Sequence, residues 1–322
     1  SHSFAAPLAT AHGRIAAAES FIIRVDTSDG RLGFGEVVRL PGFGGSEVQV
    51  LKTFCQALAG KGPRGRLESR DLPPELQFAC GAALAMIDGR LPRSGKWPLA
   101  RLLPAGPHAL YEAGRRIRQG SRCFKYKLIG IPDATEMEII GMLFEILRSV
   151  GGRIRFDANG SLPEPGAADF LLALSREGRR ALDYVEQPYP AGREDEMRLL
   201  MRETGVPVAL DESILGPENL ARWMDWQGPL VVKPSLLGNP VSLARLLDGR
   251  MFRTVLSSAF EGPVGLWGCM LAIGERRPEP LGFGVGVWGE GDAWGAFTSG
   301  ASIESGAVTA PDMEEVWHSL LF

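Results

Sequence analysis

The most regular feature of the sequence is a repeated alternation of short apolar runs with longer amphipathic stretches, which begins near residue 97. Eight runs have the length and apolar content of buried strands, near residues 98–104, 122–128, 153–157, 181–186, 206–211, 229–233, 253–258 and 281–286. Stretches with helical spacing lie between them, near residues 107–119, 133–150, 164–178, 192–204, 216–227, 240–249 and 262–276. Strands that alternate with helices pair in parallel, so the pattern predicts an α/β fold with a TIM-type (β/α)8 barrel.

The first 96 residues follow a different pattern. Residues 14–26 and 32–38 alternate apolar and polar positions on either side of the turn sequence TSDGR, which predicts a β-hairpin. Helical spacing follows at residues 47–58 and 74–88, after a glycine-rich segment at 39–46. We therefore expect an α+β domain over residues 1–96, completed by a C-terminal segment over 291–322, and a barrel domain over 97–290.

Polar side chains recur at the ends of successive predicted strands, with gaps of 30, 29, 25 and 22 residues: Lys127, Asp157, Glu186, Asp211 and Lys233. A single acid there is usually a helix N-cap, and a single lysine is usually a solvated strand end. Glu186 precedes Gln187-Pro188, however, and so cannot simply start a helix. Because the carboxyl ends of barrel strands meet at the face that carries active sites, the five side chains are expected to converge there.

The three acids suggest a metal site. They offer hard oxygen ligands, and no cysteine or histidine lies at a neighbouring strand end, which favours Mg²⁺, with Mn²⁺ as the other candidate. Such a metal can bind a substrate carboxylate and stabilise the enediolate formed when the adjacent carbon loses a proton. Lys127 is the candidate base, because the metal charge and Lys125, two residues earlier on the same side of the strand, would lower its pKa.

Composition and charge exclude several other classes of protein. A formal charge of −3 and an isoelectric point near 5.9 argue against a nucleic-acid partner. No apolar stretch approaches the roughly 20 residues of a membrane span, so no membrane partner is expected. The four cysteines have no CxxC spacing and are expected to be reduced thiols in the cytoplasm. The oligomeric state is left open, and a monomer is compatible with the sequence.

The strand-end segments resemble the muconate-lactonising subgroup of the enolase superfamily. The matching segments are KYK at 125–127, RFDANG at 155–160, VEQP at 185–188, ALDES at 209–213 and VKPS at 232–235. Together with LLPAG at 102–106 and SSAFEG at 257–262, they are most similar to the o-succinylbenzoate synthase family. The resemblance runs from about residue 14 to 286. It implies a modified (β/α)7β barrel with an α+β capping domain of the enolase type.

The resemblance also implies an activity. It is the Mg²⁺-dependent syn dehydration of a small dicarboxylate, 2-succinyl-6-hydroxy-2,4-cyclohexadiene-1-carboxylate, to o-succinylbenzoate in menaquinone biosynthesis. Lys127 would remove the α-proton and protonate the departing hydroxide, and Lys233 would stabilise the enolate from the opposite face. Asp157, Glu186 and Asp211 would bind the metal.

Further residues are implied by the same resemblance. Four of them would lie beside the metal or substrate: Lys125, Arg155, Asn159 and Glu212. Ser257, Ser258 and Gly262 would hold the substrate, and the GFGG loop at 42–45 would close over it.

Several alternatives share parts of this pattern. N-succinylamino acid racemisation also uses two opposed lysines and remains the main alternative, and no residue excludes muconate cycloisomerisation. Dipeptide epimerases of the superfamily hold an ammonium group with paired acids at the eighth strand, where this chain has no acid before Glu290. A Schiff-base aldolase would leave the three acids unexplained. A non-catalytic barrel could lose a ligand or a lysine, and none is missing here.

Overall fold

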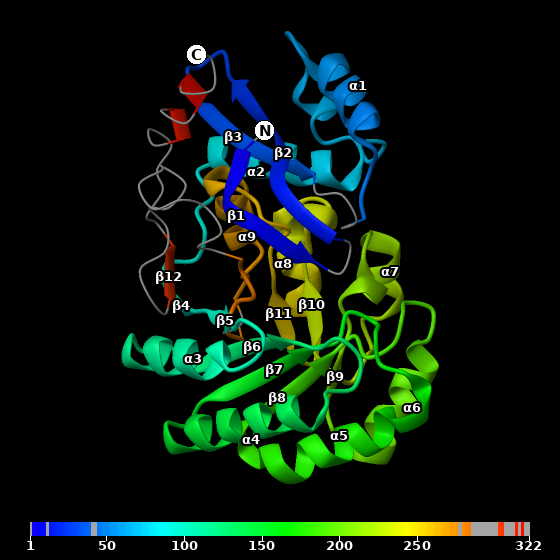
Figure 1. The fold of residues 1–322 in the computed structure, drawn as a ribbon. Coiled ribbons are helices and arrows are strands. Elements are labelled where there is room, and N and C mark those ends of the chain that lie inside the picture. The colour runs from blue at the N-terminus through cyan, green and yellow to red at the C-terminus, as the bar shows by residue number, and fades with distance from the viewer. Residues whose placement is uncertain are drawn as a thin grey trace.

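The structure is a computed structural model that describes residues 2–10, 13–39, 44–275, 279–284, 302–305, 313–314 and 317–318. In Figure 1 its lower part holds strands flanked by helices, and its upper part holds the N-terminal sheet, drawn in blue. Among the described residues, no helix is both long enough and apolar enough to cross a membrane.

The strands in the lower part of the molecule are parallel and form a ring. A five-stranded sheet has the order β5-β6-β7-β8-β9, with β5 Ala100–Leu102, β6 Cys123–Lys127, β7 Arg153–Asp157, β8 Leu182–Glu186 and β9 Val208–Ala209. A second sheet pairs β10 Leu230–Val232 with β11 Thr254–Leu256.

Isolated parallel bridges close the ring. Leu210 pairs with Leu230 and so joins β9 to β10, while Leu281 and Gly282 pair with Leu99 and Ser257 and so connect β11 back to β5. The barrel expected from the sequence is therefore confirmed. The end of the predicted eighth strand, residues 285–286, lies outside the described residues.

Helices cover the outside of the barrel: α3 His108–Arg118, α4 Ala134–Ser149, α5 Glu164–Gly178, α6 Glu194–Thr204, α7 Pro217–Arg222, α8 Pro240–Asp248 and α9 Pro263–Leu271. The outward side chains of the strands form the core against them. Phe156 of β7, for example, packs edge-on against Phe144 of α4, with ring centroids 5.8 Å apart. Short 3₁₀ turns follow the strand ends or helices at η2 Arg179–Ala181, η3 Glu212–Ile214 and η4 Pro234–Leu236.

Two helices end earlier than the sequence predicts. After α7 the chain turns inward, because the Trp226 indole donates a hydrogen bond of 2.9 Å to the carbonyl of Val208. Beyond α9, Gly274 adopts a left-handed φ of 61°, and the Glu275 amide bonds to the Asp248 carboxylate instead of continuing the helix.

The capping part is an antiparallel sheet of order β1-β2-β3 with two helices. The predicted hairpin is confirmed as β2 Gly13–Asp26 and β3 Leu32–Arg39, and β1 His2–Thr10, which the sequence analysis missed, pairs with β2. The helices are α1 Val48–Leu58 and α2 Pro74–Ile87, and a 3₁₀ turn, η1 Arg64–Arg66, lies between them. In Figure 1, α2 lies beneath β3, between the sheet and the barrel.

The division of the chain at residue 96 stays a prediction, and most of the segment 291–322 lies outside the described residues. The described part of that segment includes β12 Ser302–Ser305, which pairs antiparallel with β4 Gly95–Pro98. Arg24 of β2 lies within 3.6 Å of Glu314 and near the Trp317 ring, so the C-terminal residues contact the capping sheet.

The contact between β3 and α2 depends on two glycines. A Cβ atom on Gly35 would collide with the backbone carbonyl of Ala79, and one on Gly33 would collide with that of Ala83. The strand can lie against the helix backbone only because both residues lack a side chain.

We expect Gly35→Ala to lower the free energy of unfolding by about 1–3 kcal/mol, because the strand must move away from α2. Urea unfolding of the purified protein measures the change. Gly65→Ala is the matched control, since nothing lies within 4 Å of a Cβ atom there. Equal stability of Gly35→Ala and wild type would contradict the close packing.

Candidate active site

Strand register brings the predicted residues to one end of the barrel. Lys127, Asp157 and Glu186 are direct Cα partners across β6, β7 and β8, and Glu186 is paired with Ala209, two residues before Asp211. Lys233 follows β10 directly. Because register partners on parallel strands point to the same side, the side chains share the barrel mouth.

Two lysines make ion pairs with the three acids. Lys125 Nζ lies 2.9 Å from Asp157 Oδ2 and 2.8 Å from Glu186 Oε1, so it stands between two carboxylates. Lys233 Nζ pairs with Asp211 Oδ1. The three acids are only 1–5% exposed, so their charges depend on these partners rather than on water.

Lys127 has a different partner. Its Nζ donates to Asn159 Oδ1 at 3.2 Å, and Asn159 in turn donates to Glu212 Oε1 at 3.0 Å. Asn159 also donates its amide to Asp157 Oδ1, and it has a left-handed φ of 42°, which is uncommon for a residue other than glycine. Glu212 Oε2 is buried and has no hydrogen-bond partner among the described residues.

The electrostatics of the cluster reflect crowded negative charge. Burial raises the pKa of Glu186 to about 8, and the neighbouring Asp157 and Asp211 act in the same direction against the opposing charge of Lys125. Burial would lower the pKa of Lys125, but the surrounding carboxylates outweigh it and raise that pKa well above its usual value. Burial also opposes ionisation of Asp157, yet the lysine charges hold its pKa below the usual value.

Gln187, to which the sequence pattern assigned no role, organises the ends of β8 and β9. Gln187 Oε1 accepts hydrogen bonds from the amides of Asp211 and Ser213 at 3.0 and 3.3 Å, and its Nε2 donates to Ser213 Oγ at 2.8 Å. It is fully buried with a φ of 41°. The only signal in the sequence was an amide side chain directly after a strand-end acid. This pattern does not reveal the partners of Gln187.

Arg155 lies behind this cluster rather than in it. It is buried, pairs with Asp183 Oδ2 at 2.9 Å and donates to the carbonyl of Pro280 at 2.9 Å. Its guanidinium lies 5.0 Å from the centre of the Tyr184 ring. These contacts belong to a group of charged side chains that also includes Arg253.

The other predicted substrate residues follow β11. Ser257 Oγ donates to the Gly282 carbonyl at 3.0 Å, and Ser258 Oγ accepts from the Gly284 amide at 2.8 Å. The amide of Gly262 is bonded to Glu36 of the capping sheet. Of the predicted loop 42–45, only Gly44 and Gly45 are described, and a Cβ atom on Gly44 would lie 3.3 Å from Leu215, beyond Asp211.

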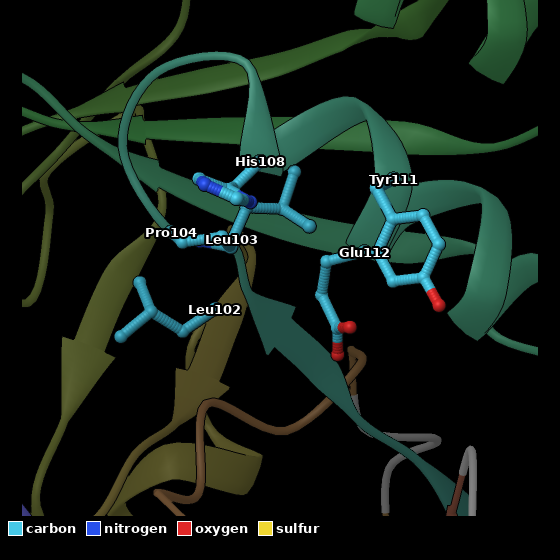
Figure 2. Close-up of a pocket in the computed structure, with 6 residues that line it drawn as sticks. All are labelled: Leu102, Leu103, Pro104, His108, Tyr111 and Glu112. Carbon is cyan, nitrogen blue, oxygen red and sulfur yellow. The ribbon is translucent and has the colours of Figure 1, made fainter.

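A surface pocket of about 510 Å³ lies beside the barrel rim, where β5 leads into α3 (Figure 2). Figure 2 shows its lining residues, which are Leu102, Leu103, Pro104, His108, Tyr111 and Glu112. None of the predicted lysines and acids lines this pocket, so it does not define the candidate site.

The oxygen atoms of the cluster determine which cation it could hold. Within the described ranges, no three histidine, cysteine or acidic side chains converge as ready ligands of one ion. In the structure, Lys125 Nζ stands between Asp157 and Glu186, while Lys233 Nζ pairs with Asp211. The donors are nevertheless carboxylate oxygens from adjacent strand ends, with the orphaned Glu212 Oε2 beside them, and this chemistry fits a hard cation.

Comparison with known proteins agrees with this site. The family model described as "Enolase C-terminal domain-like" matches residues 109–237, which span β6 to β10. The o-succinylbenzoate synthase of Thermosynechococcus vestitus is 32% identical over 289 residues, which cover 88% of this chain and 89% of that protein. The chain belongs to the o-succinylbenzoate synthase family. This family lies in the muconate-lactonising subgroup of the enolase superfamily and consists of carbon–oxygen lyases, so the chain is an enzyme.

Solved structures agree with the family assignment. A crystal structure of o-succinylbenzoate synthase from Thermosynechococcus elongatus BP-1, with magnesium in its active site, has a TM-score of 0.82 at 29% identity, covering 98% of this chain and 97% of that one. The L-Ala-D/L-Glu epimerase of Bacillus subtilis shares the fold, with a TM-score of 0.76 at 18% identity over 94% of this chain and 93% of that one.

Proposed function

We propose that the chain catalyses the syn dehydration of 2-succinyl-6-hydroxy-2,4-cyclohexadiene-1-carboxylate to o-succinylbenzoate, a step of menaquinone biosynthesis. The observation that carries the proposal is the arrangement of Lys127 at the end of β6 and Lys233 directly after β10, on either side of three buried carboxylates. The family membership supports the choice of this reaction among those of the superfamily.

The proposed cofactor is Mg²⁺, with Mn²⁺ as a substitute. Asp157, Glu186 and Asp211 would hold the ion, which when bound supplies positive charge next to the substrate carboxylate. Lys125, Asn159 and Glu212 would orient these ligands through the contacts described above. Arg155 would act from behind the cluster, through its strand, because its own contacts are with Asp183 and Pro280.

Lys127 would transfer protons, and Lys233 would offset the negative charge of the enediolate. Neutral Lys127 would take the proton from the carbon next to the carboxylate, leaving the electron pair delocalised into the carboxylate as an enediolate. The enediolate would then expel the neighbouring hydroxyl, and the same lysine would protonate it, so that water leaves and the ring becomes aromatic. The cation of Lys233 would stabilise the enediolate from the other side.

The remaining parts of the site would hold the substrate. Ser257, Ser258 and Gly262 would form one wall, and the loop 42–45 would cover the dicarboxylate. The free cysteines of the described residues fit the proposed location in the cytoplasm.

N-succinylamino acid racemisation is the second candidate. The opposed positions of β6 and β10 favour it too, because two bases on opposite faces can remove and return one proton. The absence of an acid between residues 281 and 289 argues against substrates with a free ammonium group but not against a succinylated one.

Removal of the metal should abolish dehydration. Protein treated with EDTA and dialysed is expected to lose activity, and addition of Mg²⁺ or Mn²⁺ should restore it and raise the melting temperature. The control is EDTA saturated with Mg²⁺ beforehand. Full activity of the metal-free protein would refute the metal site.

The two lysines should differ in their effects. Lys127→Ala is expected to reduce kcat/KM to below detection, whereas Lys233→Ala should lower kcat about 10²–10³-fold while product binding persists. Product formation and calorimetric binding measure these effects, with exposed Lys52→Ala as the control. Retained turnover in Lys127→Ala would assign the base to another residue.

A further inference from the structure

A carboxylate of the capping sheet is buried against the barrel. Glu36 of β3 has no exposed surface. Its Oε1 accepts hydrogen bonds from the amide of Gly262 at 3.0 Å and from Ser20 Oγ at 2.9 Å, and its Oε2 accepts from the amide of Gly265 at 2.8 Å. Glu36 therefore binds the first turn of α9, which is 226 residues away in the sequence.

This contact replaces a missing helix cap. The amides at a helix N-terminus have no partner within the helix and are usually bonded by a side chain at the N-cap position. The N-cap residue of α9 is Gly262, which has no side chain and makes no such bond. Glu36 supplies the acceptor from the other domain, and its negative charge lies at the favourable end of the helix dipole.

The contact between Glu36 and the first turn of α9, called the clamp from here on, leaves little free space. A Cβ atom on Gly265 would lie 2.6 Å from the Cβ of Glu261 and 3.1 Å from Glu36 Oε2, so only glycine lets the helix approach the carboxylate. Burial raises the pKa of Glu36 to about 7, while the two amides and Ser20 act in the opposite direction. The three donors offset the cost of burying this carboxyl group.

The clamped turn is directly connected to the candidate active site. Glu261, next to Gly262, accepts hydrogen bonds from the amide of Ala259 at 3.0 Å and from the hydroxyl of Ser235. Ser235 is two residues after Lys233, and Ala259 directly follows Ser258. The segment that leads from β11 into α9 is thus held by the barrel through Glu261 and by the capping sheet through Glu36.

We propose that Glu36 is a positioning residue, which fixes the segment 257–262 as the substrate-binding wall by holding the N-terminus of α9 against the capping sheet. Its effect on kinetics rests on the proposed function, but the clamp itself does not. A residue that only stabilised the fold would lower stability without a selective change in KM.

Glu36→Gln tests the clamp, because it keeps the shape but turns an amide NH₂ toward a backbone N–H. In the Mg²⁺-loaded enzyme we expect KM for the dehydration substrate to rise about tenfold with kcat within about twofold of wild type. Hydrogen exchange at the amides of Gly262 and Gly265 should accelerate by at least about tenfold. Unchanged exchange, or faster exchange with unchanged KM, would overturn the proposal.

A second pair of variants approaches the contact from the helix. Gly265→Ala should push the first turn away from Glu36 and raise KM as Glu36→Gln does. If Glu36→Gln fails to fold, the KM of Gly265→Ala tests the positioning role of Glu36. Gly268→Ala, one turn further along, would crowd Phe78 at 2.7 Å and should lower stability while KM stays unchanged. An equal rise in KM in Gly268→Ala would reduce Glu36 to a structural role. A wild-type enzyme without dehydratase activity would refute the proposed function alone, since the amide exchange still tests the clamp.

Discussion

The crowding of three buried carboxylates at one end of the barrel is the constraint on which the rest of the site depends. Asp157, Glu186 and Asp211 are withdrawn from water, so each needs a positive partner close by. Lys125 and Lys233 provide it in the structure, and a divalent cation provides it in the proposed mechanism. The same requirement explains why Lys125 and Lys233, rather than neutral side chains, lie beside the acids.

The barrel and the grouping of the five strand-end residues could be predicted because both follow from local periodicity. Parallel strands place their carboxyl ends together, so a polar residue that closes each apolar run must meet its neighbours. The contacts of Gln187, Arg155 and Glu36 could not be predicted in this way. Each depends on a partner far away in the sequence, and a buried polar residue in a single sequence does not reveal which backbone amide or carboxylate it will contact.

Strand β3 connects the capping sheet to the barrel. The two faces of the strand have different partners. Gly33 and Gly35 approach the backbone of α2, whereas Glu36, on the other face, reaches the first turn of α9. One face of the strand therefore packs against α2, and the other contacts α9, the helix that follows β11. This arrangement lets a small sheet that carries none of the proposed metal ligands or bases contribute to the geometry of the active site.

The lysine–carboxylate–lysine cluster is proposed to dehydrate a succinylated cyclohexadiene carboxylate. The decisive measurement is kcat/KM of the purified, Mg²⁺-loaded protein for that substrate and for an N-succinylamino acid. We expect dehydration with a kcat on the order of 1–10³ s⁻¹ and a larger kcat/KM than for racemisation. Absence of dehydration, or a larger kcat/KM for racemisation, would contradict the proposed function.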